Sequence, residues 1–125
     1  MADDRVPDDL RDFILRHIDS VAQLEALLLL RANPDESWDV AKTAGRLYAD
    51  KLEVAEVLVR LCSDGLLQCQ DGVFRYSPET ATLRQTIDRL ADLYVRHLVA
   101  VTNMIHAKPR RIRQFADAFK FKKDR

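Results

Sequence analysis

The stretch DKLEVAEVLVRLCSDGLLQCQDGVFRYS, residues 50–77, decides the fold of this chain. Its first half predicts a helix over residues 51–64. Asp50 is a good N-cap, since its carboxylate can accept from the free N–H groups of the first turn. Gly65 is placed to end the helix, because glycine adopts the left-handed conformation without steric cost.

The second half of the same stretch predicts a β-hairpin. Residues 66–70 and 73–76 are strand-like, and the two residues between them are Asp71-Gly72, which suit a type I′ turn with positive φ at Gly72. Pairing across this turn sets Cys69 opposite Phe74 and Leu67 opposite Tyr76, so that one face of the hairpin is apolar.

Three shorter helices are expected before this stretch. The first covers residues 8–18. The second begins after Ser20, which forms a capping box with Gln23, and ends at Asn33-Pro34. Asp39 caps a third helix over residues 40–48, and Ser37-Trp38 can form a very short strand before it.

A long helix over residues 79–107 is expected after the hairpin. Apolar side chains recur along it at alternating spacings of four and three residues, which is a heptad seam and predicts a homodimer. Pro109 interrupts it, and a short final helix is expected to reach Phe121. The predicted seam consists of Leu83, Ile87, Leu90, Tyr94, His97, Val101 and Met104, of which all except His97 are predicted dimer contacts.

The order of three helices and a hairpin in residues 20–77 resembles the winged helix-turn-helix superfamily. Ala44 and Leu47 match the packing positions of the first motif helix, and Gly65-Leu66 matches the usual entry into the wing. The long helix that follows is similar in layout to the dimerisation helix of PadR-type bacterial regulators. The resemblance implies a mainly α fold with a small hairpin wing over residues 1–78, followed by a dimerisation helix and basic tail over 79–125.

This resemblance implies a homodimeric, DNA-binding transcriptional regulator, because the second motif helix of the superfamily reads base edges in the major groove. Such a protein gains much of its affinity from Lys and Arg against phosphate. The basic side chains available for phosphate contacts are Lys42, Arg46, Lys51, Arg60, Arg75, Arg110, Arg111 and Arg113.

The charges on the recognition helix favour a second hypothesis. Glu53 and Glu56 would face the phosphate backbone and repel it, while Leu52 and Val59 belong to an apolar stripe beside the core stripe. This face can therefore bind a protein instead of DNA, or it can be covered by another helix of the same chain. The alternative function is a winged-helix protein-interaction module.

Composition excludes several other classes. The 125 residues include two cysteines and three glycines, too few for a disulfide scaffold or a nucleotide-binding glycine loop, and the cysteines are expected to be small apolar residues or a redox pair. No catalytic, metal or cofactor motif stands out, so an enzyme is not expected.

The acidic N-terminus and the lack of a long apolar run predict a cytoplasmic protein without membrane insertion. Residues 1–80 hold nine Lys and Arg against 16 Asp and Glu, whereas residues 81–125 hold 11 against four.

Overall fold

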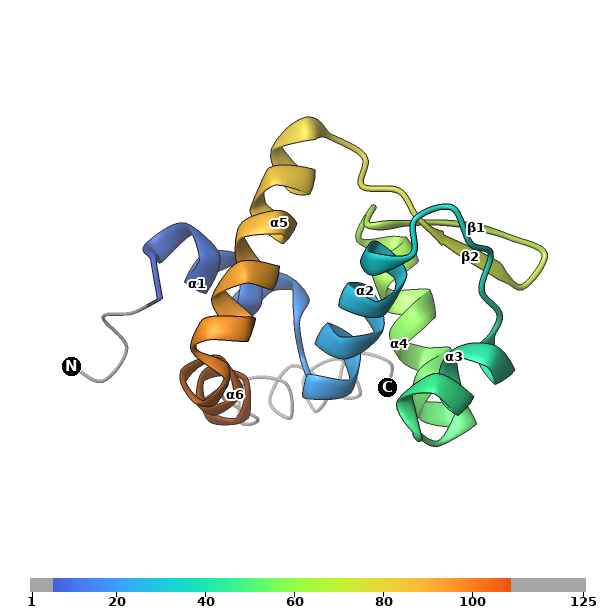
Figure 1. The fold of residues 1–125 in the computed structure, drawn as a ribbon, viewed down its shortest axis with the longest axis horizontal. Coiled ribbons are helices and arrows are strands. Elements are labelled where there is room, and N and C mark those ends of the chain that lie inside the picture. The colour runs from blue at the N-terminus through green and yellow to red at the C-terminus, as the bar shows by residue number, and fades with distance from the viewer. Residues whose placement is uncertain (1–5, 109–125) are drawn as a thin grey trace, which may run out of the picture.

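The computed structural model describes residues 6–108, which form a mainly helical fold with one small antiparallel sheet of two strands (Figure 1). No helix in this part of the chain is long and apolar enough to cross a membrane. In chain order the elements are α1 (Asp8–His17), α2 (Val21–Ala32), α3 (Val40–Leu47), α4 (Lys51–Ser63), β1 (Leu67–Gln70), β2 (Val73–Tyr76), α5 (Ala81–Arg96) and α6 (Leu98–Ala107).

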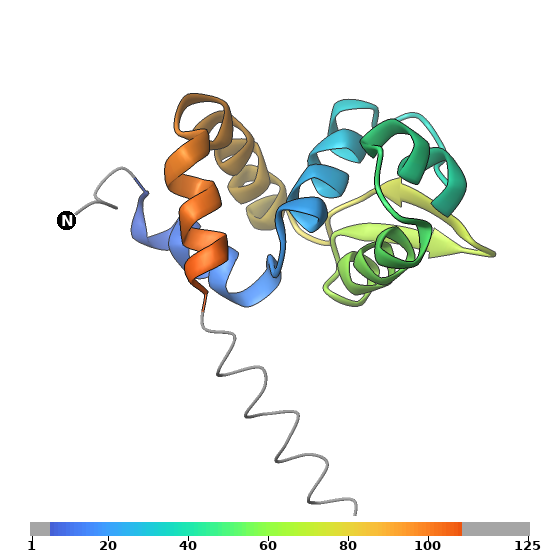
Figure 2. The same cartoon turned by 90° about the horizontal axis from the view of Figure 1, so that it is seen from below.

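These elements gather into two neighbouring lobes (Figures 1 and 2). One lobe contains α1, α5 and α6, and the other contains α2, α3, α4 and the hairpin. Leu24, Leu27 and Leu30 of α2 are fully buried and belong to the same core cluster as Ile87 and Leu90 of α5. A continuous apolar core therefore joins the two lobes.

The helix starts follow the predicted caps. The side chain of Asp39 accepts from the N–H of Lys42, and that of Asp50 accepts from the N–H of Glu53. Both helices therefore begin where the sequence predicts, because each cap satisfies an N–H group that lacks a partner within the helix.

The end of α4 at Gly65 and the type I′ hairpin turn are also found as predicted. Gly65 has a φ of 80°, and the N–H of Leu66 donates to the carbonyl of Leu61 at 3.0 Å, which is the hydrogen bond of a Schellman cap. Asp71 and Gly72 both have positive φ, at 52° and 76°, as a type I′ turn requires. The register pairs Cys69 with Phe74 and Leu67 with Tyr76, as expected.

Trp38 adds a short β-bridge to the edge of the hairpin. Its N–H donates to the carbonyl of Phe74 at 2.9 Å, and the N–H of Phe74 donates back at 2.6 Å. The segment predicted as a very short strand is therefore a single bridge, which ties the chain before α3 to β2.

The continuous helix predicted over residues 79–107 is wrong. The chain breaks at His97, whose φ of −133° and ψ of 52° are not helical, and α6 turns back to pack against α5. The heptad side chains therefore become core of the same chain: Ile87, Leu90, Tyr94, Val101 and Met104 are buried in a single copy, and Leu83 packs against them. The predicted final helix lies outside the described residues.

Candidate functional site

The outward face of α4 exposes apolar side chains between acidic ones. Val54, Leu58 and Leu61 turn into the core and are fully buried. On the opposite side of the helix, Leu52 is 78% exposed and Val59 is 58% exposed. The exposed residues Glu53 and Glu56 lie beside them. We call Leu52, Glu53, Glu56 and Val59 the α4 surface; sequence reasoning predicted all four as an outward face.

The turn before α4 contributes an aromatic side chain that sequence reasoning missed. Tyr48 has a φ of 54° and a ψ of 43°, and its N–H donates to the carbonyl of Ala44 to end α3. The left-handed conformation is uncommon for a bulky residue other than glycine and is found most often at turns and functional sites. The residue is 97% exposed, so the turn between α3 and α4 presents a tyrosine to solvent four residues before Leu52 in the chain.

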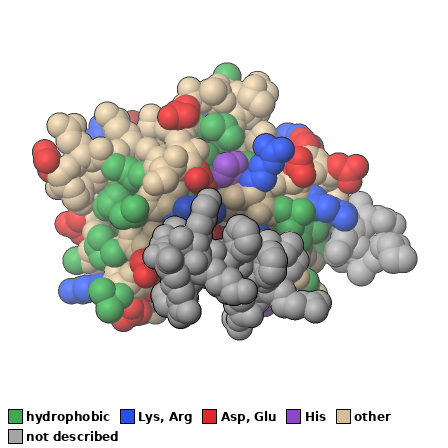
Figure 3. Space-filling view, turned by 180° about the vertical axis from the view of Figure 1, so that it is seen from behind, with side chains coloured by type: hydrophobic (Ala, Val, Ile, Leu, Met, Phe, Trp, Pro, Cys, Tyr) green, Lys and Arg blue, Asp and Glu red, His purple; other side chains and the backbone are tan. Residues whose placement is uncertain are grey.

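The hydrophobic side chains of this half of the molecule are scattered among charged ones. Figure 3 views the molecule from behind, so the lobe with α3, α4 and the hairpin lies on its left, where green groups alternate with red and blue ones. Such a surface can bind a partner through several small apolar contacts with charges around them.

Two of the cations predicted to contact phosphate are engaged beside Trp38. Lys42 Nζ lies 2.9 Å from Glu36 Oε2 and 4.3 Å from the centre of the Trp38 ring. Arg75 donates to the hydroxyl of Ser37 at 2.7 Å. A nucleic-acid phosphate could bind Lys42 only in competition with the carboxylate of Glu36.

Arg60, a third predicted cation, belongs to a charged network at the end of α4. Its guanidinium lies 2.8 Å from Asp19 Oδ2 and 3.5 Å from Asp64 Oδ2. Asp19 also accepts from Lys108 Nζ at 2.7 Å, and Asp64 lies 3.0 Å from His17 Nδ1. The network joins α4 to the end of α1 and to Lys108, so it positions these elements.

The remaining described cations near α4 have no carboxylate partner within residues 6–108. Lys51 is exposed at the start of α4, and the guanidinium of Arg46 lies 5.3 Å from the centre of the Trp38 ring. Arg110, Arg111 and Arg113 lie outside the described residues.

Cys62 and Cys69 form a disulfide, which corrects the expectation that they are separate small apolar residues. Their Cα atoms are 6.2 Å apart, within the range of disulfide geometry. The bond connects the last turn of α4 to β1. The turn at Gly65 between α4 and β1 allows this contact, because it brings β1 back against the end of α4. The spacing of seven residues alone did not reveal it.

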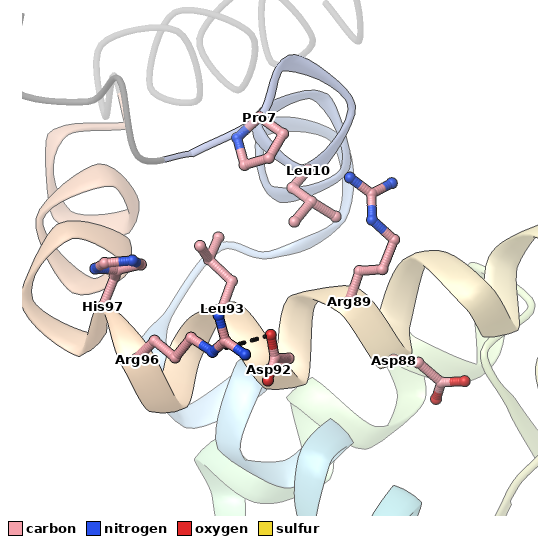
Figure 4. Close-up of a pocket in the computed structure, with 8 residues that line it drawn as sticks. All are labelled: Pro7, Leu10, Asp88, Arg89, Asp92, Leu93, Arg96 and His97. Atoms are coloured by element: carbon pink, nitrogen blue, oxygen red, sulfur yellow. Dashed lines mark ion pairs between the residues drawn. The ribbon is translucent and has the colours of Figure 1, made fainter.

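A cavity of about 420 Å³ lies between α1 and α5, in the lobe that does not contain α4 (Figure 4). Its charged side chains are paired: Arg96 lies 3.3 Å from Asp92, and Arg89 pairs with Asp9, which lowers the pKa of that carboxyl group. Among the described residues that line it, none is a serine, threonine, cysteine or lysine. The residues that line it are Pro7, Leu10, Asp88, Arg89, Asp92, Leu93, Arg96 and His97.

Comparisons with known protein families, with curated proteins and with solved structures found no significant match. Within residues 6–108, no three histidine, cysteine, aspartate or glutamate side chains are grouped as ligands for a metal ion. Within residues 6–108, the α4 surface combines two exposed apolar side chains with neighbouring carboxylates.

Proposed function

We propose that this protein is an interaction module that binds another protein through the α4 surface and the adjoining Tyr48. The observation that carries the proposal is the exposure of Leu52 and Val59 on the face of α4 opposite to its core stripe. Covering a leucine or valine side chain gives about 1.5–3 kcal/mol when its burial is complete, so two such contacts and a tyrosine can support binding.

The charges of the same face indicate the chemistry of the partner. Glu53 and Glu56 border the apolar side chains, and Asp50 caps the helix beside them. A complementary partner would present apolar side chains bordered by Lys or Arg, because opposite charges favour the correct encounter and like charges disfavour others.

We also propose that residues 20–77 have a winged-helix layout. The order α2, α3, α4, β1 and β2, together with the bridge from Trp38 to β2, supports this assignment. A cytoplasmic location stays part of the proposal, as does the absence of enzymatic activity.

A DNA-binding transcriptional regulator is the second candidate function. The observation that favours it is that one face of α4 is exposed, and that Lys51 at its start and Arg46 on α3 have no carboxylate partner within the described residues. Its weakness is charge: Lys42 and Arg60 pair with carboxylates of the same chain, whereas Glu53 and Glu56 repel phosphate.

One set of variants separates the two functions. The full chain, its Leu52→Ala/Val59→Ala variant and a Val73→Ala control would be used to capture partners from extracts of the source cells. Val73 is also exposed and apolar, but it lies on the hairpin. We expect one partner protein to be captured by the wild type and by the Val73→Ala control, but not by the double variant. After purification, that partner should bind the wild type directly.

The same proteins would be titrated with duplex DNA at several salt concentrations. Glu53→Lys/Glu56→Lys should abolish binding of the protein partner and increase non-specific DNA affinity, since it reverses the charge of the face. A salt-sensitive, sequence-specific DNA complex of the wild type, without a protein that depends on Leu52 and Val59, would replace the first proposal by the second.

A further inference from the structure

The break between α5 and α6 lacks a residue that would cause it. The chain reads Arg96-His97-Leu98 there, without the proline or glycine that usually interrupts a helix. The N-terminus of α6 also has no side-chain cap, so its first N–H groups lack the partners that a continuous helix would supply. The break therefore depends on where α6 packs and not on the local sequence.

The apolar pattern continues across the break. Leu90, Tyr94, His97, Val101 and Met104 keep alternating spacings of four and three residues, so a straight helix would place them in one seam. A continuous helix over α5 and α6 is thus compatible with the sequence on both sides of His97.

Apolar side chains are exposed at the bend itself. The exposed fraction is 82% for Val95, 52% for Leu98 and 67% for Val99. In a straight helix these residues would be at positions i, i+3 and i+4, which lie on one face. Straightening would therefore gather them into a stripe that a second copy of the same helix could cover.

We propose that His97 is a hinge through which two copies of this chain exchange α6. In the exchanged dimer α5 and α6 form one helix, and α6 packs on the body of the second copy through the contacts it makes within one chain here. Ala100, Val101, Met104 and Ile105 would again be buried. Exchange of an identical element is a low-cost route to a dimer, because it reuses interactions that already exist.

Lys108 provides a marker for this exchange. Its ammonium group donates to the carbonyls of Ile14 and Ile18 at the end of α1 and to Asp19, at 3.3, 2.9 and 2.7 Å. These bonds hold the end of α6 to α1. In the closed form they join groups of one chain, and in the exchanged form they would join groups of two chains.

The test cross-links Lys108 to Asp19 with a carbodiimide, which forms an amide directly between amine and carboxylate. Full chains labelled with ¹⁵N and unlabelled full chains are mixed, unfolded and refolded at high concentration, and the dimer is isolated by size exclusion. Exchange predicts Lys108–Asp19 peptide pairs in which one peptide is labelled and the other is not. Lys108→Arg, which keeps the charge but cannot form the amide, should lose these pairs.

Two variants of Leu98 test whether the helix straightens. Proline is favoured as the first residue of α6, but inside a continuous helix it removes a hydrogen bond and clashes with the preceding turn. Leu98→Pro should therefore keep a folded monomer and lower the dimer association constant by at least about 100-fold. Leu98→Ala removes the same exposed side chain but permits the straight helix, so its dimer should persist.

Other outcomes would overturn the proposal. A wild type that stays monomeric after refolding at high concentration has no exchange, and a dimer whose cross-links never mix isotopes is joined through its surface. A Leu98→Pro dimer with mixed cross-links would show exchange without straightening. If Leu98→Pro does not fold, the isotope test on the wild type decides. Because no step uses α4, the result does not depend on the proposed function.

Discussion

The hydroxyl of Tyr94 on α5 donates a hydrogen bond to Glu25 Oε2 on α2, with 3.0 Å between the two oxygens. This bond crosses from the lobe of α1, α5 and α6 to the lobe of α2, α3 and α4. Burial, followed by the bond to Glu25, raises the pKa of Tyr94 above its usual value of 10.0. The contact therefore contributes to stability only while the phenol keeps its proton.

Tyr94→Phe should lower the free energy of unfolding by about 1 kcal/mol at neutral pH, because one partly buried hydrogen bond is lost. Below pH 10 the wild-type tyrosine is protonated in both states, so its contribution is complete. Above pH 10 the unfolded state loses the proton first, and the contribution declines as pH rises toward the raised native pKa. Urea unfolding between pH 7 and 11 measures this, and a constant difference between the two proteins would contradict it.

Reduction of the Cys62–Cys69 disulfide should destabilise the protein. The two residues are seven apart, and closing so short a loop in the unfolded chain is worth about 2–3 kcal/mol in the chain-entropy description. Thermal unfolding with and without a thiol reductant gives the difference, and Cys62→Ser/Cys69→Ser should not respond to the reductant. Equal melting temperatures for the oxidised and the reduced wild type would argue against the bond.

Gly72→Val should destabilise the hairpin by about 1–2 kcal/mol, since a β-branched residue resists the positive φ at this position. A Cβ atom at Gly72 would meet no neighbour within 4 Å, so the effect comes from the backbone alone. Gly72→Asn is the matched control, because asparagine tolerates the left-handed region and should cost less. The order of the two melting temperatures is the measurement, and a reversed order would be evidence for another turn.

Leu90→Glu should unfold the protein and not merely separate a dimer. Leu90 is fully buried in one copy, so a carboxylate there would enter the core without a partner, at a cost of about 4 kcal/mol or more. Val95→Glu, on the exposed side of the same helix, is the control and should leave the fold intact. Circular dichroism compares the two. A folded, monomeric Leu90→Glu protein would place the heptad seam between chains after all.

Local signals explain why most of the fold could be predicted. Asp39, Asp50 and the Asp71-Gly72 turn act on backbone groups within a few residues, so their effect is visible in the sequence. The outward stripe of Leu52 and Val59 was equally visible, because one periodicity assigns both faces of a helix. The exposure of Tyr48 was not predicted, since the left-handed turn moves it out of the pattern of α3.

The sequence by itself determined the starts of α3 and α4, the hairpin and its register, and the apolar periodicity of the region after the hairpin. Only the tertiary structure decided what covers that periodic stripe and where the helix bends, at His97. It also decided the partners of Arg60 and Lys108, because Asp19 lies 41 and 89 residues away from them in the chain. The physical reason is that a heptad pattern indicates that one face of the helix is buried, but it does not indicate whether a second copy or the same chain buries that face.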